Sequence, residues 1–107
     1  MTDVNYVGSV VKILEKPVQT VSPHKMVRTD CRVQLVQIRS IQIAHLVFWG
    51  TLGHDIANNY QVNNYIMIEG YLSLPNQKIN KFLKRPVKKA QITVRKIYSI
   101  EKFTKHN

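Results

Sequence analysis

The sequence predicts an all-β protein: a small closed β-barrel with one short helix. Apolar and polar residues alternate over several segments, which is the period of strands. Helical spacing of apolar residues recurs only near residues 52–60. With 107 residues, 44% of them hydrophobic and 21% charged, the chain suits one folded domain with a modest core. We therefore expect one domain over 1–107, the barrel over 4–100, and a short basic C-terminal end.

The first predicted strand opens at residue 5 and carries the apolar side chains of Val10, Val11 and Ile13. Lys16-Pro17 marks its end, because proline cannot donate to a central ladder. Ser22-Pro23-His24 has the composition of a loop or turn.

In the second predicted strand Cys31, Val33 and Leu35 alternate with polar residues, which indicates a half-buried strand. Cys31 is the single cysteine, so it forms no internal disulfide and is expected in the core. At Leu35-Val36 the alternation changes phase. A phase change of one residue predicts a β-bulge that bends the strand around the barrel.

The third predicted strand covers residues 41–49. Leu46 and Phe48 fall on its core face, and Trp49 falls on the opposite, outward face. A helix is predicted next, over residues 52–60, where apolar residues recur every four positions. Three apolar residues define that period: Leu52, Ile56 and Tyr60.

Two more strands complete the predicted order. Asn63-Asn64 forms a tight turn, and residues 65–74 then alternate again. A basic loop leads to the last strand, 90–100, with Arg95 on its polar face. Three strands, a short helix between strands three and four, and two further strands form the layout of a five-stranded OB-fold barrel.

Positive charge is concentrated in the last third of the chain. The formal net charge is +10, of which residues 71–107 carry +9. Such asymmetry predicts a polyanionic partner, either a nucleic acid or an anionic surface, although a solvated basic tail would have the same composition. No apolar run is long enough to span a bilayer, and no amphipathic helix accompanies the basic loop, so we expect no membrane partner.

The segment VFWGTLGHDIANNYQVNNYIMIEGYL resembles the middle of bacterial-type single-stranded DNA-binding proteins. Trp49-Gly50 and Leu52 match the family's aromatic-Gly-x-Leu pattern, and Ile66 to Leu72 matches its apolar-x-apolar-Glu-Gly-x-Leu pattern. The resemblance covers about residues 4–100 and is specific over 46–72. It implies an OB-fold that binds single-stranded DNA without sequence specificity in DNA replication or maintenance, as a homo-dimer or tetramer.

The sequence departs from the family pattern at several positions. Ile43 stands where a tryptophan is often found, and Asn63 replaces a turn glycine. The sequence ends at KFTKHN, without the acidic-tipped tail that recruits replication enzymes. It is also similar to primosomal replication protein N and to small plastid-encoded relatives. Together with a composition typical of AT-rich genes, this predicts a plastid (chloroplast) location, with the bacterial cytoplasm as the alternative.

Base stacking on exposed aromatic rings is the chemistry expected of such a protein. Trp49 is the first candidate, and the alternative is that it fills a subunit interface or the edge of the barrel. Tyr71 either stacks or is an ordinary exposed strand tyrosine. His45 either contacts the ligand or is an ordinary surface histidine. Phe82 lies among lysines, where it either stacks or folds back onto the barrel.

Cations expected to follow the phosphates lie in the loop before the last strand and on polar strand faces. Lys25 and Arg28, assigned to the first loop, extend them. The predicted set is Arg32, Arg39, Lys78, Lys81, Lys84, Arg85, Lys88, Lys89 and Arg95.

Catalysis, a metal site and a cofactor are not predicted. The six acids form no pair at useful spacing, and the histidines and Cys31 lack metal-ligand spacing. No glycine-rich phosphate loop is present. Two other functions fit the sequence: an OB-fold module for protein interaction in a primosome-type assembly with replication proteins, and an RNA-binding OB-fold.

Overall fold

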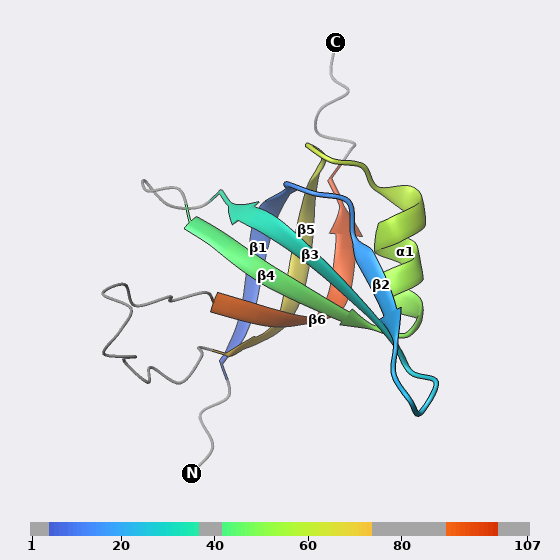
Figure 1. Cartoon of the computed structure of the whole chain (residues 1–107). Helices are drawn as coiled ribbons and strands as arrows, with labels where there is room; N and C mark the ends of the chain where they lie inside the picture. Colours follow the sequence, from blue (N-terminus) through green and yellow to red (C-terminus); the bar gives the residue numbers. More distant parts are fainter. Residues whose placement is uncertain (1–4, 37–41, 74–89, 101–107) are drawn as a thin grey trace, which may run out of the picture.

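The protein is built mainly of strands, with one short helix (Figure 1). The structure is a computed structural model that describes residues 5–36, 42–73 and 90–100. Within these ranges the elements are β1 (Tyr6–Ile13), β2 (Val18–Val21), β3 (Val27–Leu35), β4 (Gln42–Trp49), α1 (Thr51–Asn59), β5 (Tyr65–Ser73) and β6 (Ala90–Ser99).

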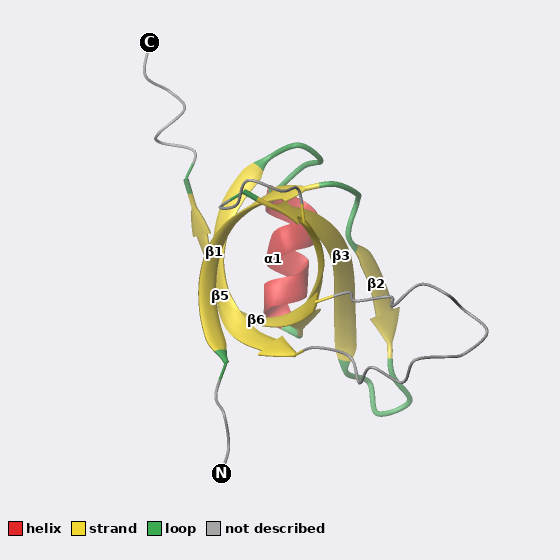
Figure 2. Ribbon diagram, turned by 90° about the vertical axis from the view of Figure 1, so that its left-hand side faces the viewer, coloured by secondary structure: helices red, strands yellow, loops and turns green. Residues whose placement is uncertain are grey.

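The sheet closes on itself. Its strand order is β1-β5-β6-β4-β3-β2, and an additional pairing joins β1 to β3, so five strands form a ring and β2 lies outside it. All of these pairs are antiparallel except β4–β6, which is parallel. Figure 2 looks into the ring and shows α1 across its opening.

The inner face of the ring forms the core, because alternate residues of each strand point inward. Phe48, Leu46 and Ile56 are fully buried there, and Ile56 comes from α1. Cys31 is buried as predicted, and burial raises the pKa of its thiol to about 11. The other buried core residues come from all five ring strands: Val11, Ile13, Val33, Ala44, Ile66, Ile68, Ile92 and Val94.

The mostly-β prediction with one short helix is confirmed, but the strand count is not. The described residues form six strands rather than five, and the helix follows the fourth strand rather than the third. The additional strand, β2, pairs with the first half of β3, so that the two form an arm projecting from the ring (Figure 1). All four residues of β2 are exposed, so no alternation of buried and exposed residues marks this strand.

The predicted bulge at Leu35-Val36 is not where the register shifts. The pairing of β3 with β4 is continuous, and β3 ends at Leu35. The described shift lies between Glu69 and Gly70, where β5 pairs with β6. There the backbone of Thr93 and Val94 lies so close that a Cβ on Gly70 would be 2.9 Å from the Val94 Cα. The glycine of the Glu-Gly motif is thus required by packing.

Candidate nucleic-acid interface

Trp49 lies at the corner where β4 turns into α1. Its neighbour Phe48 is fully buried, whereas Trp49 is 40% exposed, as strand alternation predicts. Gly50 makes the corner with φ 65° and ψ −134°, a conformation open essentially only to glycine. The Gly50 N–H donates to the Val27 carbonyl at 2.9 Å, which ties the corner to β3. The Trp-Gly pair therefore places an indole on the outer face.

Arg28 lies directly opposite Trp49 across the β3–β4 pair. Its guanidinium carbon is 5.8 Å from the centre of the Trp49 ring, within the range of a cation–π contact. The sequence placed Arg28 in a loop, which is wrong: it belongs to β3, and strand pairing fixes its position. A cation and an aromatic face thus meet at one point of the outer surface.

Asp30 joins Arg28 to His45. Arg28 donates from Nε and Nη2 to the two Asp30 carboxylate oxygens, both at 2.9 Å. His45 Nε2 lies 2.5 Å from Asp30 Oδ2. Desolvation alone would raise the pKa of Asp30, but the hydrogen bonds from Arg28 and His45 outweigh it and lower that pKa. These four residues, Trp49, Arg28, Asp30 and His45, are called the Trp49 cluster below.

A second aromatic group lies on β1 and β5. Tyr71 and Tyr6 are paired in register, with their ring centres 5.0 Å apart and their planes at 74°. The Arg95 guanidinium carbon is 6.0 Å from the Tyr71 ring centre. The Tyr6 hydroxyl donates to Glu69 Oε1 at 3.0 Å. Tyr71, Tyr6, Arg95 and Glu69 are called the Tyr71 cluster.

The two clusters share one continuous face of the sheet. Residues that are directly opposite in register point to the same face. One such row crosses β3, β4, β6, β5 and β1: Asp30, Val47, Thr93, Tyr71 and Tyr6. Adjacent strands lie about 4.8 Å apart, so the row spans about 19 Å along the curved surface.

Val47 fills the middle of this row. It lies on the outward parity of β4, as expected from the sequence, yet it is only 1% exposed and is not part of the inner core. Val47 is therefore covered by other residues and is not open to solvent.

The predicted site residues fall into three groups. Trp49, His45, Tyr71 and Arg95 lie in the two clusters. Arg32 lies opposite His45 but donates from Nε to Glu15 Oε1 at 3.0 Å, so its charge is partly neutralised within the chain. The remaining predicted residues lie outside the described ranges: Arg39, Phe82, Lys78, Lys81, Lys84, Arg85, Lys88 and Lys89.

Sequence reasoning missed Asp30 and Tyr6 and gave Arg28 no aromatic partner. Their significance depends on strand register across residues far apart in the chain, such as the pairing of Tyr6 with Tyr71. Arg28-x-Asp30 at a spacing of two was a readable signal, because residues i and i+2 share a strand face. It could be used only once Arg28 was placed in a strand.

Chemically, the face offers aromatic rings beside cations. Among the described residues, no group of three or more histidine, cysteine or acidic side chains could hold a metal ion. In the same ranges, no helix is long and apolar enough to cross a membrane. Rings for stacking and guanidinium groups for phosphates are the components of a surface that binds single-stranded nucleic acid.

Several solved structures of single-stranded DNA-binding proteins share this fold. The SSB domain of a Synechococcus protein superposes with a TM-score of 0.71 at 15% identity, covering 92% of this chain and 98% of that one. The second single-stranded DNA-binding protein of Mycobacterium smegmatis gives 0.73 at 11% identity, over 98% and 97%. Mitochondrial Rim1 of S. cerevisiae gives 0.72 at 7%, over 92% and 96%. At these identities the likeness establishes the fold.

A sequence relative establishes the family. No protein-family model matches the chain. A protein of Trieres chinensis named "Putative single-stranded DNA-binding protein ycf41" is 35% identical over 99 residues, covering 88% of this chain and 87% of that protein. The chain belongs to this family of single-stranded DNA-binding proteins, as its sequence resemblance indicated.

Proposed function

We propose that this protein binds single-stranded DNA without sequence specificity, through the outer face that carries the Trp49 and Tyr71 clusters. The observation that carries the proposal is the pairing of each exposed ring with a guanidinium, Arg28 at Trp49 and Arg95 at Tyr71. Base stacking contributes about 1–3 kcal/mol per base and tolerates any sequence, because every base has a π-face. The name of the Trieres relative supports DNA as the ligand.

The charge of the chain supports the same function. With +10 overall, the protein attracts a polyanion, and each neutralised phosphate releases counterions. We propose that the basic segment before β6 extends the phosphate track, with Phe82 as a further stacking ring. Its cations are Lys78, Lys81, Lys84, Arg85, Lys88 and Lys89, and Arg39 joins them from the segment before β4.

Four further points complete the proposal. The ring and helix correspond to an OB-fold in which β2 is an addition to the five usual strands, which is consistent with the SSB-domain neighbours. A single ring offers a short binding face, which favours a homo-dimer or tetramer. DNA replication or maintenance in a plastid fits the family and the AT-rich character of the composition. We propose that the protein binds DNA and catalyses no reaction.

The test is a titration of the protein with oligo-dT, an RNA oligomer and duplex DNA over a series of salt concentrations. Trp49 is the sole tryptophan, so its fluorescence reports directly on the proposed contact. We expect strong quenching by dT that weakens with salt, and little quenching by duplex. Quenching that is equal for RNA would widen the ligand class.

A substitution separates stacking from general attraction. With a labelled dT oligomer followed by anisotropy, Trp49→Ala should bind about 5- to 150-fold more weakly, which corresponds to one lost stacked base. Trp49→Phe, the matched control, keeps a ring and should lose much less. If Trp49→Ala bound dT as tightly as the parent, and dT did not quench Trp49 fluorescence in the parent, the proposal would be refuted. The outer face would then be better explained as a surface for protein partners.

A further inference from the structure

One edge of β2 has no neighbouring strand. β2 lies outside the ring and pairs only with β3 (Figure 2). Edge strands are commonly protected against pairing with another chain by a lysine, a bulge or a covering segment. Val18–Val21 contains no charged residue, its register with β3 has no shift, and all four residues are exposed. In the described part of the chain, this edge is therefore open to another strand.

The ladder between β2 and β3 shows which backbone groups of β2 are free. The Ser22 N–H donates to the Met26 carbonyl at 2.9 Å, at the position that continues the register of the two strands. Hydrogen-bonded and non-hydrogen-bonded pairs alternate along an antiparallel ladder, so the even-numbered residues of β2 bond to β3. Gln19 and Val21 therefore direct N–H and C=O away from the sheet, and these groups have no backbone partner among the described residues.

An exposed valine and a pocket lie on the same side of this edge. Val21 is 68% exposed, more than any other large hydrophobic residue in the described ranges. A pocket of about 550 Å³ lies beside Pro17, just before the other end of β2, with Ala57 of α1 among its walls. Positions 17, 19 and 21 share one parity. Gln19 Nε2 lies 3.5 Å from His54 Nδ1, so this parity faces α1.

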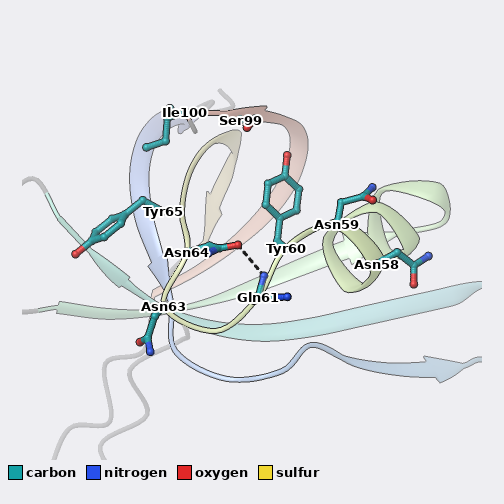
Figure 3. Close-up of a pocket in the computed structure, with 9 residues that line it drawn as sticks. All are labelled: Asn58, Asn59, Tyr60, Gln61, Asn63, Asn64, Tyr65, Ser99 and Ile100. Carbon is teal, nitrogen blue, oxygen red and sulfur yellow. Dashed lines mark hydrogen bonds between the residues drawn. The ribbon is translucent and has the colours of Figure 1, made fainter. Parts of the chain in front are cut away.

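The far wall of the pocket is the loop between α1 and β5. Tyr60, Gln61 and Val62 of this loop line the pocket. Figure 3 shows the loop, which also lines a neighbouring pocket, with Asn64 Oδ1 accepting from the Gln61 N–H at 2.9 Å. This hydrogen bond holds the backbone that bounds the pocket beside Pro17.

A second copy of the chain fits this edge. When two β2 strands pair antiparallel about a two-fold axis at Gln19, each Val21 lies opposite Pro17 of the other copy. The two Gln19 residues then exchange hydrogen bonds, and each Val21 N–H donates to the opposite Pro17 carbonyl. The same register brings each Val21 side chain to the pocket beside the opposite Pro17. One contact is thus made twice, as two-fold symmetry requires.

We propose that β2 joins neighbouring molecules of this protein on one DNA strand, by pairing edge to edge with β2 of a second copy. This rests on the function proposed above and extends it to cooperative binding. So short an edge buries far less than a stable interface needs, about 1,000 Å², and each chain carries a net charge of +10. The contact therefore depends on DNA, which neutralises charge and raises the effective concentration of the second copy to about the millimolar range.

The pairing also joins the two proposed DNA-binding faces. Opposite residues point to the same side, so the outer faces of both copies lie on one side of the joined sheet. From Trp49 to Trp49 of the second copy, the path crosses β2, β3 and β4 of both copies, about 24 Å at about 4.8 Å per strand spacing. About seven nucleotides at the stacked spacing of about 3.4 Å cover this distance.

The test titrates dT oligomers of about 8 and about 70 nucleotides, which hold one and several molecules, with the parent, Gln19→Pro and Gln19→Ala. Gln19→Pro removes an N–H that β3 does not use, and proline is tolerated at such an edge position, so the fold is kept. Gln19→Ala is the matched control, because it loses the same side chain and keeps the N–H.

The parent and Gln19→Ala should fill the long oligomer cooperatively, with few singly occupied strands in a gel-shift series. Gln19→Pro should lose about ten-fold in affinity for a site next to an occupied one. Its affinity for the short oligomer and the quenching of Trp49 should equal those of the parent. Val21→Ala, which leaves the backbone groups unchanged, should also lower the cooperativity.

The other outcomes separate the inference from the proposed function. Parent-like cooperativity in both Gln19→Pro and Val21→Ala would overturn the inference and leave the proposed function standing. If the parent fills the long oligomer without cooperativity, no second copy occupies the edge, and a strand of another protein becomes the better occupant. If Gln19→Pro has a smaller mass than the parent by light scattering without DNA, the proposed dependence on DNA is wrong. If the parent binds neither oligomer, the proposed function fails together with the inference.

Discussion

At the scale of single residues, Asp30 organises the Trp49 cluster. An acid on a face proposed to bind phosphates is unexpected, since it repels the ligand. Its two oxygens accept hydrogen bonds from Arg28 and His45, and Arg28 lies over Trp49. Asp30 therefore holds the cation beside the ring before any ligand arrives, at the cost of part of the positive charge.

The lowered pKa of Asp30 predicts a pH-dependent contribution to stability. The ionised form contributes fully above the unfolded-state pKa of about 3.9, and the contribution is lost as pH falls through the lower folded-state pKa. At pH 7, Asp30→Asn should reduce the free energy of unfolding by about 1 kcal/mol, the scale of a partly exposed ion pair. In urea titrations at about pH 3 the two proteins should approach each other in stability.

The control for Asp30→Asn is Asp55→Asn. Among the described residues Asp55 accepts from the Asn59 amide and has no ion-pair partner, so its substitution should change stability less. A stability difference between parent and Asp30→Asn that stays the same at both pH values would show that the ionised carboxylate is not responsible.

Alternation along each strand was enough to predict which way Trp49, His45, Tyr71 and Arg95 face. It could not predict that Arg28 meets Trp49 or that Tyr6 meets Tyr71, because those contacts depend on register between separate strands. Alternation also cannot show that a residue on the outward parity is buried, as Val47 is. The orientation of the site residues was thus predictable, whereas their partners were not.

At the scale of elements, the close approach of α1 to β3 depends on Gly53. This helix residue is buried, and a Cβ built on it would lie 2.8 Å from the Thr29 Cβ and closer still to Thr29 Oγ1. Thr29 is itself fully buried, and among the described residues its hydroxyl has no hydrogen-bond partner. Glycine at position 53 therefore allows α1 to approach β3, because a larger side chain would overlap Thr29.

Gly53→Ala should destabilise the protein by about 1–3 kcal/mol through overpacking, in spite of the better helix propensity of alanine. Thr29→Ala removes the closer contact and should recover part of this loss in the double variant, measured as a coupling energy in urea unfolding. Thr29→Val keeps a methyl group in that place and should give no recovery. Additive effects of Gly53→Ala and Thr29→Ala would contradict direct contact.

Elements with a clear period were predictable from the sequence, and the exceptions have identifiable causes. β2 has four exposed residues after Pro17, so no burial pattern marks it, and its pairing with β3 defines it as a strand. The bulge was assigned to Leu35 from a phase change at the end of a strand. The register shift at Gly70 leaves the alternation of β5 intact and is visible only in its pairing with β6.

At the scale of the whole molecule, two short pairings close the ring. β1 meets β3 through three residue pairs, Val11 with Leu35, Lys12 with Gln34 and Ile13 with Val33, and β4 meets β6 through four. The two clusters proposed to bind DNA share one face only while β4 and β6 stay paired, because the row that links them crosses from one strand to the other. The function proposed here therefore depends on contacts between residues far apart in the chain.

A shared core predicts that this closed ring unfolds as one unit. Trp49 fluorescence reports the corner of β4 and α1, and tyrosine absorbance reports chiefly the four tyrosines on β1, β5 and β6. In urea the two signals should have the same midpoint, since buried side chains from all five ring strands pack together. Ile13→Ala, at the β1–β3 seam, should lower the free energy of unfolding by about 2–5 kcal/mol and move both midpoints equally. If the tyrosine signal changed at lower urea than the Trp49 signal, one part of the ring would unfold before the rest, and the prediction of a single unfolding unit would be wrong.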